Sequence, residues 1–421
     1  MTSKSDQSST WADRAIAETY RTDWGRLLSL LVAHTRRLDL AEDALSEAFA
    51  RASERWPTAG VPVNPAGWLY TTASRVVLGQ LRSEAIHGRK AKLLAVSTDW
   101  AQPTATGDIG DVDDERLALV LLCCHPALHP AARSPLALRL VIGTTTDDIA
   151  RLFVVSRATM AARITRAKKK IVAAGIPLAA PVDSELRTRL DDVCRTIYLA
   201  FTAGYAPANG PDLLRTDLAG DAVELADVLR RLVPDAHQVQ ALNGLLLLQH
   251  ARRDARVRDG RLVTLADQDR SLWQQDQIRT GTELISSLPP GTEYAEELRL
   301  QGLIAAQHAG SQKASDTHWP TIARLYAQLE TLTGSPIVRL NRAVAAGEAE
   351  GPQAGLDIIE GLDHALANNH RLHAVRADLA RRAGNTRLAR TSYQAALELC
   401  TNEVEQRYLT HQLAALNSSN P

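Results

Sequence analysis

The segment from Thr145 to Lys170, TTDDIARLFVVSRATMAARITRAKKK, limits the possible folds more than any other part of the chain. It begins with a candidate helix cap at Thr146, followed by three apolar residues that share one helical face. These three are Ile149, Leu152 and Phe153. A turn at Val154 and Val155 leads to a second candidate cap, Ser156. A second apolar stripe then repeats at spacings of 4, 3 and 4, at Met160, Ile164, Ala167 and Ile171. Two short helices joined by a tight turn predict a helix-turn-helix.

The outward face of the second helix is expected to be strongly basic. Between Gly143 and Gly175 seven Lys or Arg stand against two Asp, a net charge of +5, whereas the whole chain has 48 basic and 48 acidic residues. The face comprises Arg157, Arg163, Thr165, Arg166, Lys168, Lys169 and Lys170. Cationic side chains that neutralise phosphates release condensed counterions, so this concentration indicates a DNA-binding helix. The alternative is an ordinary solvated hairpin with a basic end.

Length and composition suit a soluble globular protein of two to four domains. The chain has 421 residues, 45% of them apolar and 23% charged. It contains no run of 18 apolar residues, and its start, MTSKSDQSST, lacks the apolar core of a signal peptide. We therefore expect a cytoplasmic protein without membrane association.

The cysteines suit a reducing compartment, because none forms a CxxC pair. They are Cys123, Cys124, Cys194 and Cys400. Cys123, Cys124, His125 and His129 lie close in sequence, but Pro126 disrupts the helix that would align the two histidines. We expect buried thiols and no metal site.

The rest of the chain reads as helical, so the predicted fold class is all-α. We expect a disordered tail over residues 1–18, a helical domain over 19–92, an acidic linker over 93–113, the helix-turn-helix domain over 114–175, a hinge over 176–183 and a helical domain over 184–421.

Two helices are expected between Trp24 and Trp56. Asp39 is a candidate cap of the second, and Pro57 is expected to end it. Asn64 and Pro65 then form a typical helix start, with a capping side chain before a proline at the first helical position. The helix that follows is basic in its later part.

The last helices resemble a tetratricopeptide unit of about 34 residues. Gly384 falls in the turn between two helices, and small or aromatic packing residues flank it at Ala377, Ala380, Ala389, Tyr393 and Ala396. Arg376 stands where a leucine is usual. Stacked helix pairs of this kind leave a concave surface that suits a peptide or protein partner.

A family resemblance spans about residues 20–415. The blocks DLAEDALSEAF, NPAGWLYTTAS and DERLALVLLCCHPALHPAARSPLALRL, followed by the helix-turn-helix, resemble an extracytoplasmic-function (ECF) sigma factor of bacterial RNA polymerase. The first block is similar to the family's region 2 and the last to its region 4. IYLAFTAGYAP, LLRTDLAGDAVELADVLRRLVPD and SPIVRLNRAVAAGEAEGPQAGL resemble the large C-terminal extension of one ECF subgroup.

This resemblance implies core RNA polymerase and promoter DNA as partners, and three sets of site residues. The implied polymerase-binding residues are Asp39, Glu42, Asp43, Leu45, Glu47 and Phe49. The implied residues for the −10 element, where an extruded base is held in a pocket, are Trp68, Thr71, Thr72, Ser74, Arg75 and Arg82. The implied residues for the −35 element, read in the major groove, are Arg157, Thr159, Ala161, Ala162, Thr165, Arg166 and Lys169.

The chain departs from the family in the helix for the −10 element. Members resemble ARNRAIDRLRR where this chain has ASRVVLGQLRS, so Arg75, Gly79 and Gln80 replace the expected Asn, Asp and Arg. A glycine inside a helix costs about 1 kcal/mol relative to alanine. These departures keep open a second hypothesis, that the chain is a sigma-derived scaffold or decoy that no longer opens promoters. Pro135 is also expected to kink a region 4 helix.

No catalytic motif is present. The sequence has no Walker loop, GxSxG, HExxH or glycine-rich dinucleotide turn. We therefore expect a sigma factor without enzymatic activity or cofactor, monomeric when free, whose C-terminal domain regulates it or binds a protein partner. A repressor that uses only the helix-turn-helix would not need the acidic helix from Asp39 to Arg51.

Overall fold

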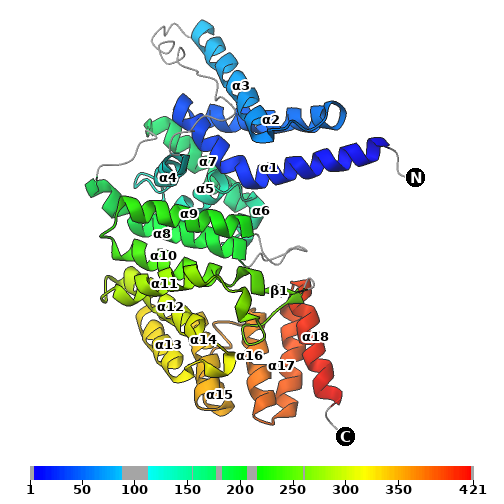
Figure 1. The fold of residues 1–421 in the computed structure, drawn as a ribbon, viewed down its shortest axis with the longest axis vertical. Coiled ribbons are helices and arrows are strands. Elements are labelled where there is room, and N and C mark those ends of the chain that lie inside the picture. The colour runs from blue at the N-terminus through cyan, green and yellow to red at the C-terminus, as the bar shows by residue number, and fades with distance from the viewer. Residues whose placement is uncertain are drawn as a thin grey trace. The chain divides into compact units, whose positions relative to one another are not determined.

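The computed structural model describes residues 4–87, 112–153, 155–176, 183–205, 216–258 and 261–418. The described residues are almost entirely helical, as the ribbon in Figure 1 shows. They divide into two compact units, Met1–Ala200 and Phe201–Pro421. Val154 and most of the linker and hinge expected from the sequence lie outside the described residues. The predicted all-α fold class is confirmed.

The first unit contains the helices from α1 to the greater part of α8. They are α1 (Lys4–Thr35), α2 (Leu38–Ala59), α3 (Pro65–His87), α4 (Val112–Cys123), α5 (Pro130–Leu140), α6 (Thr146–Leu152), α7 (Arg157–Ala174) and α8 (Asp183–Tyr205). Helices α1, α2 and α3 pack on one another around a core that includes Leu28, Leu45 and Leu69, each 0% exposed. Helices α5, α6 and α7 form a second packed group, and α4 joins the two because it contacts both α1 and α5.

The second unit is a series of helices that pack mainly on their neighbours in sequence. They are α9 (Thr216–Leu232), α10 (His237–His250), α11 (Gln275–Ser287), α12 (Glu293–Gly310), α13 (Trp319–Thr333), α14 (Pro336–Ala349), α15 (Pro352–Ile359), α16 (His370–Arg382), α17 (Thr386–Leu399) and α18 (Glu403–Ser418). In the part of this unit that the structure describes, three short 3-10 helices lie between them: η2 (Arg253–Ala255), η3 (Arg270–Leu272) and η4 (Ala314–Asp316). Packing of each element on the next is typical of helical repeat proteins.

The predicted tetratricopeptide-like packing positions are buried. Gly384 adopts a left-handed φ of 78° between α16 and α17, which is a conformation that glycine tolerates without strain. All five predicted packing residues, Ala377, Ala380, Ala389, Tyr393 and Ala396, are at most 2% exposed. Arg376 stands at the leucine position and pairs with Asp363 at 2.7 Å.

One minimal hairpin was not predicted from the sequence. Strands β1 (Val257–Arg258) and β2 (Arg261–Leu262) pair antiparallel, with Val257 opposite Leu262. Two residues a strand are too few to produce an alternating pattern, so the sequence carries no signal for it.

The predicted disordered tail over residues 1–18 is wrong for its described part. Helix α1 begins at Lys4 and runs through this segment to Thr35. Ala12 is 0% exposed, so this part of the segment packs against the rest of the protein. The many Ser and Thr residues at the start concealed this helix.

The predicted boundaries of α2 are also corrected. The cap position is Arg37 rather than Asp39, and the Asp39 carboxylate instead accepts hydrogen bonds from the Arg37 guanidinium at 2.8 and 3.0 Å. This bonding holds the pKa of Asp39 below its usual range. Pro57 does not end the helix, which continues to Ala59 and stops at Gly60. Pro57 lies two residues from the end of α2, so the N–H bond that it removes belongs to the last turn of the helix.

Candidate nucleic-acid interface

Two side-chain caps define the helix-turn-helix. Thr145 caps α6 by accepting a bond from the backbone N–H of Asp148 at 3.1 Å, so the cap lies one residue before the predicted Thr146. Ser156 caps α7 as predicted, accepting from the N–H of Thr159 at 3.1 Å. These bonds satisfy N–H groups that have no partner within the helix. Gly175 ends α7 in the left-handed conformation.

Helix α7 has the predicted two faces. The apolar stripe is buried, with Met160 at 0%, Ile164 at 4%, Ala167 at 6% and Ile171 at 4% exposure. Every residue predicted to read the −35 element is exposed: Arg157, Thr159, Ala161, Ala162, Thr165, Arg166 and Lys169. Because these seven side chains share the surface that the stripe leaves outward, a groove of DNA can reach them together.

Two basic residues of α7 turn inward instead. The Arg163 guanidinium donates to the carbonyl oxygen of Ala131 at 3.2 Å, on the neighbouring helix α5. This is the carbonyl that Pro135, four residues later, cannot bond because proline has no N–H. Helix α5 continues through Pro135 to Leu140, and Arg163 donates to the carbonyl that Pro135 leaves without its helical donor.

The other inward residue, Lys168, binds α2. Its Nζ lies 2.6 Å from a carboxylate oxygen of Glu42. The Glu42 side chain is 13% exposed and that of Lys168 is 28% exposed, so water screens this pair less than a surface ion pair. The basic helix is thereby attached to the acidic helix that resembles region 2.

The residues implied for polymerase binding divide into two kinds. Asp43 and Glu47 are exposed on α2, and Glu47 pairs with Arg51 of the same helix, 2.9 Å away. Leu45 and Phe49 are 0% and 7% exposed, so both belong to the core of the first unit. Phe49 meets Tyr20 edge to face, with ring centroids 5.2 Å apart.

The residues implied for the −10 element lie on α3, which starts as predicted. Asn64 Oδ1 accepts a bond from the N–H of Gly67 at 2.8 Å, and Pro65 is the first helical residue. Arg75 and Arg82 are exposed, whereas Trp68, Thr71 and Thr72 are half-buried. Trp68 meets Trp56 edge to face, with centroids 5.6 Å apart. Ser74 is 5% exposed and lies inside the core.

Sequence reasoning missed a close contact between α1 and the residue that follows α5. A Cβ atom added to Gly25 would lie 1.6 Å from the carbonyl oxygen of Val141. Nearby, the Arg139 guanidinium donates to the Tyr20 hydroxyl at 3.1 Å and lies 5.7 Å from the centroid of the Trp24 ring. An isolated glycine inside a helical pattern was the available signal, because such a residue often marks close packing.

The cysteines are buried, as predicted, and all four are free thiols. Burial raises the pKa of Cys124 to about 12, so this thiol stays protonated at neutral pH. In the second unit, His370, Cys400 and Glu405 place ligand-type atoms within 4.8 Å of one another. His370 Nε2 and a Glu405 carboxylate oxygen already form a hydrogen bond at 2.8 Å. None of the described helices has the length and apolarity needed to cross a membrane.

Known protein families match three parts of the chain. Residues 10–86 match sigma-70 region 2, residues 118–171 match sigma-70 region 4, and residues 189–288 match a family of unknown function, DUF6596. The uncharacterized protein R00370 of Rhizobium meliloti (strain 1021) is 37% identical over 409 residues, which cover 96% of this chain and 95% of that protein. No solved structure matches the chain.

These matches agree with the geometry. Region 4 ends with α7, whose exposed basic face lies over a buried stripe, and region 2 contains α1, α2 and α3. The DUF6596 match lies in the helical part that follows. The sequence-based family assignment is confirmed: the chain belongs to the ECF-type sigma factors, DNA-binding proteins of transcription initiation, and carries a large helical C-terminal extension.

Proposed function

We propose that this sigma factor binds core RNA polymerase through α2, reads the −35 element with α7 and contacts the −10 element with α3. The observation that carries the proposal is the exposed face of α7, where seven candidate reading residues lie over a buried apolar stripe. A capped helix that is anchored on one face and cationic on the other suits insertion into the major groove.

The exposed side chains of α7 suit different kinds of DNA contact. Arg157 and Arg166 have the forked donors that pair with the N7 and O6 acceptors of guanine. Ala161 and Ala162 are small enough to contact thymine methyl groups. Lys169, exposed near the end of the stripe, suits a phosphate contact, which sets position without reading sequence.

On α2 the acidic side chains are the ones available to polymerase. Asp43 and Glu47 are exposed and do not contribute to the core, whereas Leu45 and Phe49 act from within by fixing the helix. A docking surface with exposed carboxylates favours a basic partner surface through electrostatic complementarity.

The contact between Glu42 and Lys168 also supports a closed state of the free protein. Because the Glu42 carboxylate is 13% exposed and is bonded to α7, it cannot face polymerase at the same time. Polymerase binding at α2 therefore competes with α7. We infer that core polymerase releases α7 from α2, so that promoter reading becomes available after assembly.

In vitro transcription tests the proposed function. The chain and core polymerase are mixed with the DNA upstream of the chain's own gene, and a transcript with one defined start is expected. If core polymerase is bound and no transcript forms on any tested DNA, the scaffold or decoy hypothesis replaces this proposal. The altered sequence at Arg75, Gly79 and Gln80 is the feature that would then explain the loss.

The double variant Asp43→Lys with Glu47→Lys tests the docking surface. We expect core binding to weaken by about tenfold or more, because two carboxylates that face a basic partner become repulsive. Neither substitution touches the Glu42 pair with Lys168. Affinity is measured by titrating labelled protein with core polymerase. Glu54→Lys, an exposed acid further along α2, is the control and should bind as the parent does. Equal binding by the double variant and the parent would contradict the assignment of α2.

We also propose that the C-terminal extension regulates the sigma regions, and the structure sets where to cut the chain. Asp192 pairs with Arg133, and Thr196 bonds Ser134 at 3.0 Å, so the first part of α8 supports region 4. A chain that ends at Tyr205 keeps these bonds. It should retain core binding and show altered transcription on the same promoter. Transcription equal to that of the full chain would mean that the extension acts independently.

A further inference from the structure

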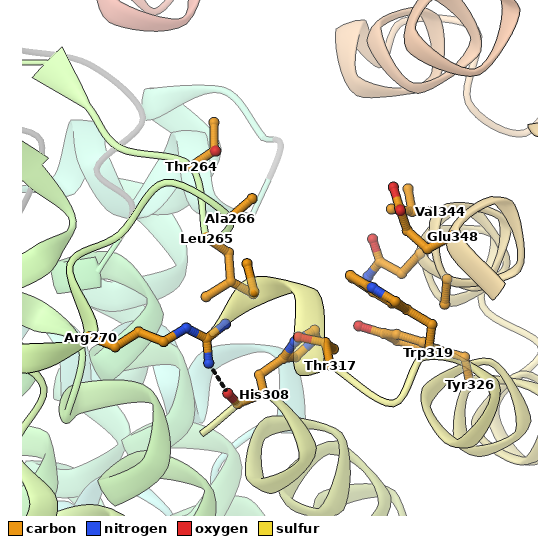
Figure 2. A pocket seen from close by; sticks show the side chains of 13 residues that line it. Thr264, Leu265, Ala266, Arg270, His308, Thr317, Trp319, Tyr326, Val344 and Glu348 are labelled. Atoms are coloured by element: carbon orange, nitrogen blue, oxygen red, sulfur yellow. Dashed lines mark hydrogen bonds between the residues drawn. The ribbon is translucent and has the colours of Figure 1, made fainter. Parts of the chain in front are cut away.

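The second unit contains a cavity that no sigma region uses. Its volume is about 400 Å³, and its walls come from the loop after β2, from η3, and from α12, α13 and α14. A cavity of this size is in the range of small-molecule sites, which is roughly 300 to 1,000 Å³. Figure 2 shows its two sides, with Arg270, Leu265 and His308 on one and Trp319, Tyr326 and Glu348 on the other.

The cavity walls are lined by apolar and aromatic side chains. Trp319 and Tyr326 from α13 and Val344 from α14 form one side, opposite Leu265. His308 holds Trp319 in place edge to face, with ring centroids 5.3 Å apart. A flat or aliphatic ligand body would gain contact area here without distorting the wall.

Arg270 supplies a fixed positive charge at the cavity. Its Nη1 donates to the carbonyl oxygens of His308 at 2.7 Å and Ser311 at 2.5 Å, and the guanidinium stacks on the Trp273 ring, 4.5 Å from the centroid. Trp273 itself is 3% exposed. A guanidinium has five donors, so the carbonyl bonds leave further N–H groups for a ligand. Among the described residues no ion pair joins Arg270 to a carboxylate, although the charge of Asp316 acts on its guanidinium.

The other ionisable groups at the cavity do not cancel this charge. Glu348 is neutralised by Arg382, whose Nη1 lies 2.5 Å from its carboxylate. Burial, together with the nearby guanidinium groups of Arg252 and Arg270, lowers the pKa of His308 to about 4, so this imidazole is neutral at pH 7. The cavity therefore presents one arginine that forms no ion pair, beside walls that are mainly apolar.

We propose that this cavity is a binding site for a small organic anion, a carboxylate with an aromatic or aliphatic body. The carboxylate lies against the free donors of Arg270, and the body packs between Leu265 and the rings of Trp319 and Tyr326. Arg270 is held in position before binding, so little side-chain freedom is lost when the ligand enters. The C-terminal extension would then bind a small molecule at a site separate from those for DNA and polymerase.

Calorimetric titration of the full chain tests the site. The probes are indole-3-acetate, benzoate, 3-phenylpropanoate and octanoate, each compared with its neutral amide. We expect at least one acid to bind about tenfold or more tightly than its amide, because the amide lacks the charge-assisted bond to Arg270. The measurement needs neither polymerase nor promoter, so its failure would leave the proposed function standing.

Two variants locate the bound anion. Arg270→Gln removes the charge and should weaken acid binding by about tenfold or more, while amide binding changes little. Val344→Phe keeps Arg270 and fills the cavity, so it should abolish binding of both forms. Arg324→Gln is the control, because Arg324 is an exposed arginine of α13 that does not line the cavity. Thermal melts confirm that each variant is folded.

Three results would overturn the proposal. The first is that none of the four acids binds the parent chain. The second is equal affinity for an acid and its amide. The third is unchanged acid binding by a folded Val344→Phe variant, which would place the ligand elsewhere.

Discussion

The Gly25→Ala variant should separate region 2 from region 4 in the free protein. The added Cβ would lie 1.6 Å from the Val141 carbonyl oxygen. This atom belongs to the backbone, so the clash is relieved only if the two segments move apart, whereas a flexible side chain could rotate away. We expect the closed arrangement to lose about 1–3 kcal/mol, a shift of roughly 5- to 150-fold toward open forms. Binding of the free chain to its own upstream DNA should tighten accordingly.

Zero-length cross-linking measures the closed state directly. A carbodiimide joins a carboxylate to an amine only when the two are in contact, as Glu42 and Lys168 are at 2.6 Å. The cross-linked peptide pair should form in the parent chain. Its yield should fall in Gly25→Ala, and it should also fall in the parent chain when core polymerase is added.

Gly79→Ala is the matched control for this experiment. It makes the same chemical change inside a helix, but apart from its chain neighbours and the backbone of its own helix no atom lies within 4 Å of the added Cβ. It should keep the cross-link and stabilise α3 by up to about 1 kcal/mol, since alanine favours helix. If Gly25→Ala folds and gives the same cross-link yield as Gly79→Ala, the closed state does not depend on this contact.

The second large effect is expected at α7. Arg166→Ala should lose about 1–3 kcal/mol of discrimination between the native −35 element and a mutated one, because a forked donor to a base edge is removed. Lys169→Ala should weaken binding to all DNA by a similar factor and reduce the salt dependence by about one ion. Anisotropy titrations at several salt concentrations separate the two results. Identical losses on native and mutated DNA in both variants would mean that α7 contacts only phosphates.

In the second unit, features set by local sequence pattern were predictable, whereas features set by long-range contacts were not. The packing positions around Gly384 were predictable because small residues at helical spacing have one way to bury. The cavity beside Trp319 was not, because its walls come from segments between Thr264 and Glu348 that converge only in the folded chain. Arg270 lies over the Trp273 ring, and its place beside the cavity carried no sequence signal.

The sequence by itself determined the local features of the site. Three features follow from hydrogen-bond capping and the 3.6-residue period, which act within one helix: the Ser156 cap, the buried stripe from Met160 to Ile171, and the exposure of the candidate DNA-contact residues. Tertiary structure decided the exceptions. Arg163 bonds the Ala131 carbonyl that Pro135 leaves without its helical donor, and Lys168 bonds Glu42 instead of lying on the exposed face of α7. Both partners lie on other helices, and contacts over such sequence separations depend on how whole helices pack, which periodicity within one helix does not specify.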